Sequence, residues 1–78
     1  MTDVVITMLG RLTPERKPEF IAILTGHGCP LDLAHRHADI MMTAHEKTTA
    51  IRPHVDRVKL REELDAVGIA LIVKNAET

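Results

Sequence analysis

The residues best suited to do chemistry are histidines and one acid between positions 35 and 45. His35, His37, Asp39 and His45 carry imidazole and carboxylate groups, which are common zinc ligands. On a helix His37 and His45 share a face with Met41, whereas His35 pairs with Asp39 on the polar face. No two histidines stand four residues apart, the usual helical spacing of zinc ligands. We therefore expect no metal or other cofactor, and we expect His37 to be a packed, hydrogen-bonded residue at the core or its rim.

Cys29 is the only cysteine, and its nearest candidate base is His27, two residues earlier in a glycine-rich turn. A cysteine nucleophile needs a base within hydrogen-bond reach and a third group to orient that base, and neighbouring positions in the chain establish neither. One cysteine excludes an internal disulfide and suits a reducing compartment. We expect Cys29 to be a structural turn residue. Because no paired carboxylates, serine–histidine–acid set or nucleotide loop stands out, we expect no enzymatic activity.

Met41, Met42 and His45 are the candidate binding residues. Methionine packs adaptably against varied apolar groups, and a histidine at the rim can add one hydrogen bond. Together these side chains suggest a small pocket for a side chain of a partner peptide. The alternative is that Met41 belongs to the core and Met42 lies at its edge.

The fold depends on whether residues 31–51 form a helix or a hairpin. At helical spacing the stretch from 33 to 46 separates into an apolar arc and a polar one, and His37 and Met41 lie on the apolar arc. At strand spacing one face would mix apolar with charged residues. No Gly or Pro interrupts residues 31–52. We predict an amphipathic helix, capped by Asp32 and running to about Glu46.

A strand and a short helix are predicted ahead of this stretch. Residues 4–9 are β-branched and apolar and are followed by Gly10, a pattern typical of a strand. Residues 11–17 should form a loop, because the residue before Pro18 is pushed out of the α region. The first helix should begin at Pro18 and end near Gly26, a frequent C-terminal cap.

Two strands and a third helix are predicted after it. Residues 48–51 indicate a short edge strand that ends before Pro53. Asp56 should cap the third helix, which ends at Gly68. The core residues of this helix follow helical spacing: Leu60, Leu64 and Val67. Residues 69–73 are apolar on both faces, which favours a central or well-covered strand.

These elements predict a single small α+β domain over residues 1–78. The order is β-α-α-β-α-β, with helices packed on one face of a small, largely antiparallel three-stranded sheet.

Composition excludes several kinds of partner. The chain is 45% hydrophobic and 27% charged, as in globular proteins, and Phe20 is the only aromatic residue. A formal charge of −1 with dispersed basic residues gives no footprint for nucleic acid. No apolar run reaches membrane-spanning length, and the acid at Asp3 does not suit a secretory signal. We expect a cytoplasmic protein that binds neither nucleic acid nor membrane.

Several short motifs resemble two families that share one fold, the C-terminal domain of the bacterial ribosomal stalk protein and the ClpS-type adaptors. Residues 4–10 and the final LREELDAVGIALIVK are similar to the stalk domain. Residues 18–24, PEFIAIL, and 41–51, MMTAHEKTTAI, are similar to ClpS. The ClpS resemblance adds Phe20 to the candidate peptide-binding residues. The acids that follow the first strand in ClpS are absent here, since residues 9–12 read LGRL.

The resemblance implies a non-enzymatic interaction module that binds a partner protein or peptide through residues 33–46 and their neighbours. A protease chaperone or a translation-related protein would be the implied partner. The alternative is a resemblance to the ACT domain, a ferredoxin-like fold of order β-α-β-β-α-β, carried by VVITMLG, LTGHG and LREELDAVGIALIV. That resemblance implies a dimeric regulatory domain for a small molecule such as an amino acid, and it requires a hairpin within residues 31–45.

Overall fold

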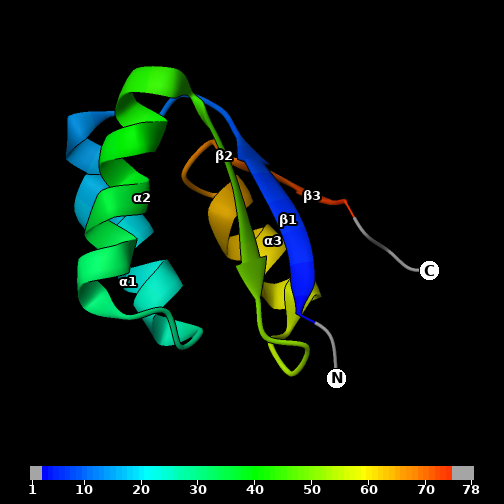
Figure 1. The fold of residues 1–78 in the computed structure, drawn as a ribbon. Coiled ribbons are helices and arrows are strands. Elements are labelled where there is room, and N and C mark those ends of the chain that lie inside the picture. Colours follow the sequence, from blue (N-terminus) through cyan, green and yellow to red (C-terminus); the bar gives the residue numbers. More distant parts are fainter. Residues whose placement is uncertain (1–2, 75–78) are drawn as a thin grey trace.

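The computed structural model describes residues 3–74, which form three strands, three α-helices and one short 3-10 turn (Figure 1). The elements follow in the order β1 (Val4–Leu9), η1 (Pro14–Arg16), α1 (Lys17–Gly26), α2 (Leu31–Ala44), β2 (Glu46–Ile51), α3 (Arg57–Asp65) and β3 (Ala70–Val73). The predicted α+β class and β-α-α-β-α-β order are confirmed. Because residues 31–44 form a helix, the order β-α-β-β-α-β of the alternative fold is wrong.

The sheet is antiparallel with strand order β2-β1-β3, so β1 is the central strand. Ile6 pairs with Thr49 on one side and with Val73 on the other. The prediction that β2 is an edge strand is confirmed, but the prediction that β3 is central or well covered is wrong. Both outer strands pair with β1, and Ile72 and Val73 remain 41% and 37% exposed. An apolar strand therefore marks one edge of this sheet.

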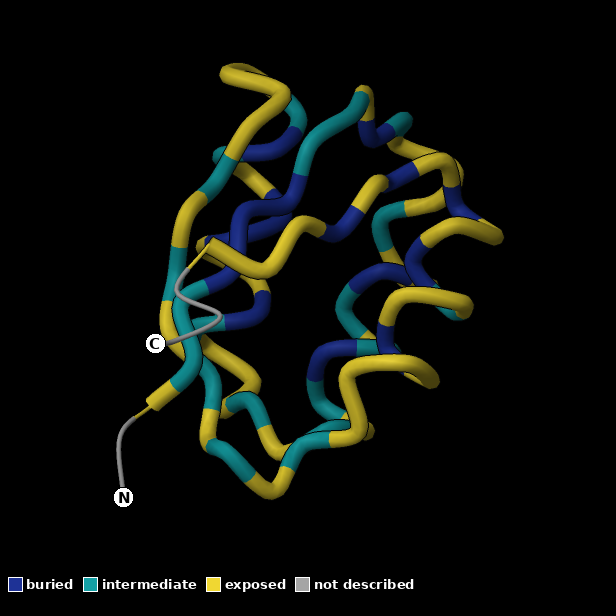
Figure 2. The backbone as a smooth tube through the Cα atoms, turned by 90° about the vertical axis from the view of Figure 1, so that its right-hand side faces the viewer, coloured by how far each residue is buried: buried dark blue, intermediate teal, exposed yellow. Residues whose placement is uncertain are grey.

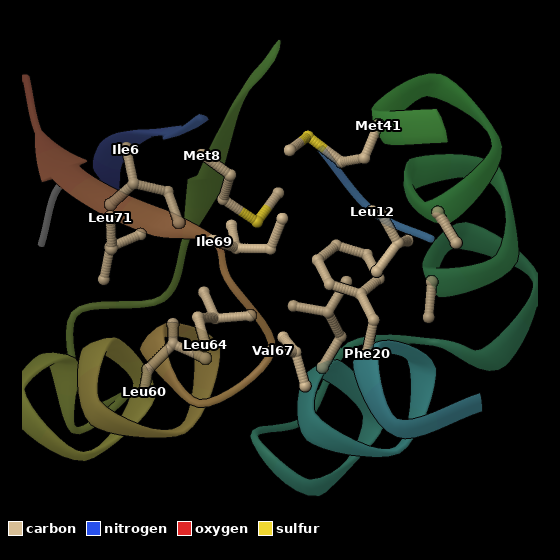
Figure 3. Packing of buried hydrophobic residues seen from close by; sticks show 13 residues of the cluster. Ile6, Met8, Leu12, Phe20, Met41, Leu60, Leu64, Val67, Ile69 and Leu71 are labelled. Atoms are coloured by element: carbon tan, nitrogen blue, oxygen red, sulfur yellow. The ribbon is translucent and has the colours of Figure 1, made fainter. Parts of the chain in front are cut away.

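The core lies between the sheet and the helices (Figure 3). α2 packs on β2, α3 packs on β3, and α1 contacts both α2 and α3. Buried and exposed positions alternate along every helix, as expected of amphipathic helices on one side of a sheet (Figure 2). The predicted stripe of α3 is buried, as are Met8 of β1, Phe20 of α1 and Met41 of α2.

Two helix starts differ from prediction. α1 begins at Lys17, not Pro18, and η1 stands within the expected loop. Proline is tolerated in a first helical turn because the amide hydrogen it lacks would have no partner there. α2 begins at Leu31 after Pro30, and the N-cap makes no side-chain hydrogen bond. Asp32 is therefore not the cap; it lies in the first turn, where a carboxylate is favoured by the helix dipole.

A single residue, His45, connects the end of α2 to the start of β2. The helix stops at Ala44, two residues earlier than predicted, because His45 adopts a left-handed conformation at φ 60°. Its amide donates to the Met41 carbonyl at 3.2 Å, and its own carbonyl accepts from Gly10 at 3.0 Å. α2 and β2 consequently run in opposite directions side by side (Figure 1).

At the third helix the capping prediction is confirmed. The side chain of Asp56 accepts a hydrogen bond from the Lys59 amide at 3.1 Å. The helix ends at Asp65, three residues before the predicted end at Gly68, and a turn follows in which Gly68 has a φ of +83°. These contacts orient α3 so that Leu60 and Leu64 face the sheet in Figure 3.

Candidate functional site

A groove of about 260 Å³ opens between the helices and the sheet at the end where β1 begins. We call it the α2–β2 groove. Its lining includes Leu33 and His37 from α2, Thr49 and Ile51 from β2, Leu24 from α1 and Leu60 from α3. The volume is slightly below the ~300–1,000 Å³ of sites for drug-sized ligands. It therefore suits one amino-acid side chain or a ligand of similar size.

The groove follows from the composition of the core. Aromatic side chains fill the widest spaces in most cores, and this chain has one aromatic residue, Phe20. Phe20 packs beside Leu12 at the other end of the helical layer, with Met41 above them (Figure 3). The end near Ile51 and Leu60 is left to aliphatic residues. Aliphatic side chains from five elements line this space without closing it.

His37 contributes the buried polar group of the groove. The residue is 5% exposed, and within residues 3–74 its Nδ1 has no hydrogen-bond partner. The prediction of a packed residue is correct, but the predicted hydrogen bond is missing at this atom. Burial, followed by the positive charges of Lys47 and Arg36, lowers the pKa of His37 below its ordinary value of 6.5. The imidazole is therefore neutral at neutral pH.

Thr49 of β2 and His37 of α2 both line the groove. Eight helical residues separate His37 from the turn at His45, a rise of ~12 Å. Four extended residues separate Thr49 from the same turn, a rise of ~13 Å. Because α2 and β2 run in opposite directions from that turn, His37 and Thr49 stand at the same level. Their imidazole and hydroxyl are two of the polar groups in a mainly apolar lining; the others come from Asp3, His27, Cys29 and Arg52.

The turn between α1 and α2 brings His27 and Cys29 to the groove. Nε2 of His27 lies 2.7 Å from Oε1 of Glu63, which is the acid–imidazole half of a nucleophilic triad. The third member is not activated, however. Burial and then the charge of Asp32 raise the pKa of the Cys29 thiol above its ordinary value, so the thiol stays protonated at neutral pH. This arrangement does not activate Cys29 as a nucleophile.

The acid predicted near the histidines has another partner. Asp39 Oδ1 accepts a hydrogen bond from Lys17 Nζ at 2.8 Å, which joins α2 to α1. The hydrogen bond and charge of Lys17 lower the pKa of Asp39. Within the described part of the chain, no three His, Cys, Asp or Glu side chains gather closely enough to hold a metal ion.

The four residues predicted to bind a peptide occupy two different environments. Phe20 and Met41 are fully buried in the core, whereas Met42 is half-buried and His45 is exposed. The His45 ring stays near its own helix, with Nδ1 3.2 Å from the Met41 carbonyl oxygen. None of the four lines the α2–β2 groove. Their role in binding stays a prediction, and the groove is a second candidate at the other end of α2.

Sequence patterns gave a partial signal for the groove. His37 is the one ionisable residue on the apolar arc that the helix buries, and this position hinted at a special environment. Nothing marked Thr49 or Ile51, because the groove joins residues from five elements through tertiary packing.

Comparisons with protein-family models, curated proteins and solved structures found no match to this chain. In residues 3–74 no helix combines the length and apolar character needed to cross a membrane.

Proposed function

We propose that this domain is a non-enzymatic interaction module that binds an aliphatic side chain of a partner peptide or protein in the α2–β2 groove. The observation that carries the proposal is the open, mainly aliphatic groove itself. Leu33 and Ile51 line it from opposite sides, and Leu24 and Leu60 come from the helices beneath the sheet. Burying one aliphatic side chain there would contribute about 1.5–3 kcal/mol.

The size of the groove favours a single side chain over a flat protein surface. Contacts of this kind are weak alone, so the partner would add contacts around the rim or bind transiently. The resemblance to ClpS and to the ribosomal stalk domain points to a protease chaperone or a translation-related protein in the cytoplasm. Both of these partner classes, and the location, belong to the proposal.

The protonated Cys29 thiol supports a binding role over a catalytic one. A nucleophile at neutral pH needs a lowered pKa or an adjacent base that is free to accept its proton. Burial and Asp32 act on Cys29 in the opposite sense, and the Nε2 of His27 is held by Glu63. The residues around the groove are therefore suited to contact a ligand and to leave it unchanged.

Nuclear magnetic resonance tests the proposal directly. ¹⁵N-labelled protein is titrated with acetylated five-residue peptides that carry one Leu, Ile, Val or Met, each as the free acid and as the amide. Matched peptides with Ala at that position serve as controls. We expect saturable shifts of backbone amides in residues 24–37 and 49–60 with at least one aliphatic peptide, and none with its Ala control.

Two outcomes would contradict the proposal. Absence of saturable shifts with every peptide would show that the groove accepts no aliphatic side chain. Shifts confined to residues 41–46 and 10–12 would instead place binding at the surface that carries Met42 and His45.

A further inference from the structure

We infer that two copies of this chain associate through the free edge of β3, in antiparallel register about a two-fold axis at Ile72, so that their two sheets become one continuous sheet. The inference does not rest on the α2–β2 groove, because no residue of β3 except Leu71's neighbours across the sheet comes near it and β3 does not line it. It is carried by the composition of the edge, by the directions of the backbone groups of β3 and by the charges of α3.

The two edges of the sheet differ in how well they resist pairing with another strand (Figure 1). β2 begins with Glu46 and Lys47, and charged side chains on an edge strand disfavour such pairing. β3 reads ALIV and carries no charge, and its Ile72 and Val73 are among the exposed large apolar residues. An exposed apolar edge promotes association with another strand. β3 is therefore the edge that a second strand would cover.

The backbone groups of Leu71 and Val73 point to the free edge. The Lys74 amide donates to the Val5 carbonyl oxygen at 2.8 Å, so Lys74 bonds towards β1. Alternate residues of an antiparallel strand bond to the same neighbour, so Ile72 also bonds towards β1. The residues between them, Leu71 and Val73, direct their N–H and C=O groups the other way. These are the groups that a second strand can pair with.

One register pairs these groups in two identical copies. An axis at Ile72 sets Leu71 of each copy opposite Val73 of the other, and each such pair exchanges two hydrogen bonds. An axis at Leu71 would bring Val73 to Ile69, whose amide already donates to the Leu64 carbonyl at 2.9 Å. An axis at Val73 would leave Leu71 opposite residue 75, outside the described residues. With the axis at Ile72, the two Ile72 side chains are direct neighbours on one face of the sheet.

The charges of α3 suit an antiparallel copy of the same helix. Its first half carries the bases Arg57, Lys59 and Arg61, and its second half carries the acids Glu62, Glu63 and Asp65. The dipole of a single helix favours the opposite arrangement, with acids near the N-terminus and bases near the C-terminus. An antiparallel second α3 would place each basic half beside an acidic half and beside the negative end of the other helix.

Three of these charged residues lie on the flank of α3 above the free edge. The contact of Glu63 with His27 marks the flank that faces α1. On a helical wheel Arg57, Arg61 and Asp65 fall on the opposite flank. Because α3 packs on β3 and α1 packs on its inner side, this opposite flank lies over the edge of the sheet. All three residues are exposed, and within residues 3–74 none of them forms an ion pair.

The axis at Ile72 coincides with the middle of this flank. Ile72 lies two residues, ~7 Å, from the start of β3. Arg61 lies four residues, ~6 Å, before the end of α3. Since α3 and β3 run in opposite directions from the turn between them, the two residues stand at about the same level. The axis therefore brings Arg57 of each copy towards Asp65 of the other. The two Arg61 side chains meet at the centre, and their repulsion makes the dimer weak.

Sedimentation velocity and ¹⁵N spectra of the whole chain, recorded from micromolar to millimolar concentration, test the inference. We expect an equilibrium between monomer and dimer, with concentration-dependent shifts of the amides in residues 57–65 and 70–74. Val73→Pro should give a folded monomer, because it removes an N–H that points away from β1 and edge strands tolerate proline.

An exchange of charges distinguishes this arrangement from any other dimer. Arg57→Glu and Asp65→Arg should each weaken self-association by about tenfold or more, because each variant places like charges together twice in the dimer. An equimolar mixture of the two variants should recover association, since every contact between positions 57 and 65 then joins opposite charges. Lys59→Glu makes the same change of charge as Arg57→Glu at an exposed position that does not face the edge. This control should stay within about threefold of the native protein.

Several outcomes would overturn the inference. One is a monomer at every concentration: rapid hydrogen exchange of the Leu71 and Val73 amides would then leave the edge to a different protein, and slow exchange would show that the same chain covers it. Another is a dimer whose charge variants do not complement each other, or that a folded Val73→Pro does not weaken, since it forms through another surface. The charge variants decide the question even if Val73→Pro fails to fold. Peptide titrations test the groove separately, so either proposal can fail alone.

Discussion

The imidazole of His27 and the carboxylate of Glu63 lie 2.7 Å apart, and this contact fastens the end of α1 to α3 beside the α2–β2 groove. The His27 side chain is 16% exposed and that of Glu63 is 39% exposed. The two residues are 36 positions apart in the chain, so the contact joins the end of α1 to α3 across the helical layer, beside the groove.

We expect Glu63→Gln to lower the free energy of unfolding by about 1 kcal/mol or less, because solvent screens a half-exposed pair. The measurement is urea unfolding at neutral pH of Glu63→Gln, His27→Ala and the double variant. A coupling energy near zero in this cycle would show that the contact does not stabilise the fold. Exposed Glu62→Gln, on the neighbouring position of α3, is the matched control.

The depressed pKa of His37 predicts a stability that depends on pH. The unfolded chain binds a proton on this residue near pH 6.5, while the native protein does not until lower pH. The lowered pKa of His37 therefore adds to the free energy of unfolding in full above pH 6.5. This addition is lost as the pH falls from 6.5 towards the pKa in the folded state, by at most about 1.4 kcal/mol per pH unit. Urea unfolding at pH 7.5 and 5.5 measures the loss.

His37→Leu should lose less stability than the native protein between these two pH values, since it has no imidazole to protonate. His35→Leu, which removes an exposed imidazole from the same helix, should resemble the native protein. An identical pH profile for His37→Leu and the native protein would mean that His37 is already protonated in the folded state or is solvated.

Gly10 is required by a close approach between two turns. A Cβ on Gly10 would lie 2.5 Å from the carbonyl oxygen of Gly68, and its φ of +140° is unfavourable for other residues. We expect Gly10→Ala to destabilise the fold by about 1–3 kcal/mol or more. Gly26→Ala is the control, because it stands at the end of α1 with open space around it and should be neutral or stabilising by up to ~1 kcal/mol.

Thermal unfolding of the two glycine variants is the measurement. A Gly10→Ala protein as stable as Gly26→Ala would show that β1 and the turn after α3 can move apart without cost.

Met41 and Met42 should differ sharply when truncated. Met41 is fully buried, so Met41→Ala removes packed atoms and should cost about 2–5 kcal/mol. Met42 is half-buried, and Met42→Ala should cost about 1 kcal/mol or less. Urea unfolding measures both. Equal costs would contradict the placement of Met41 in the core, and a greater loss of peptide binding in Met42→Ala would support the site predicted from the sequence.

Much of this fold could be predicted from local sequence patterns. The period of residues 33–46 identified α2, and the Asp56 cap and its following stripe identified α3, because each signal depends on neighbours within one element. The position of β3 in the sheet could not be predicted in the same way. Its apolar residues suit burial on both faces, but strand order depends on which strands pair with β1.

The groove was beyond sequence analysis for a related reason. His37 could be placed on a buried face, yet its missing hydrogen bond depends on what β2 presents opposite it. The volume at Ile51 and Leu60 depends on how far α1 and α3 stand from the sheet. Both quantities belong to tertiary packing and leave no periodic trace in the chain.

The claim that the α2–β2 groove is the binding site is tested most directly by a substitution that fills the groove with a larger side chain. Leu33 is half-buried and lines the groove, whereas Leu31, two residues earlier, is 60% exposed and does not. The measurement is the affinity of the acetylated five-residue peptide that carries one Leu for Leu33→Trp and Leu31→Trp, with folding of both checked by ¹⁵N spectra. We predict at least a tenfold loss of affinity for Leu33→Trp and native affinity for Leu31→Trp. Native affinity in both variants would contradict the assignment of the site to this groove.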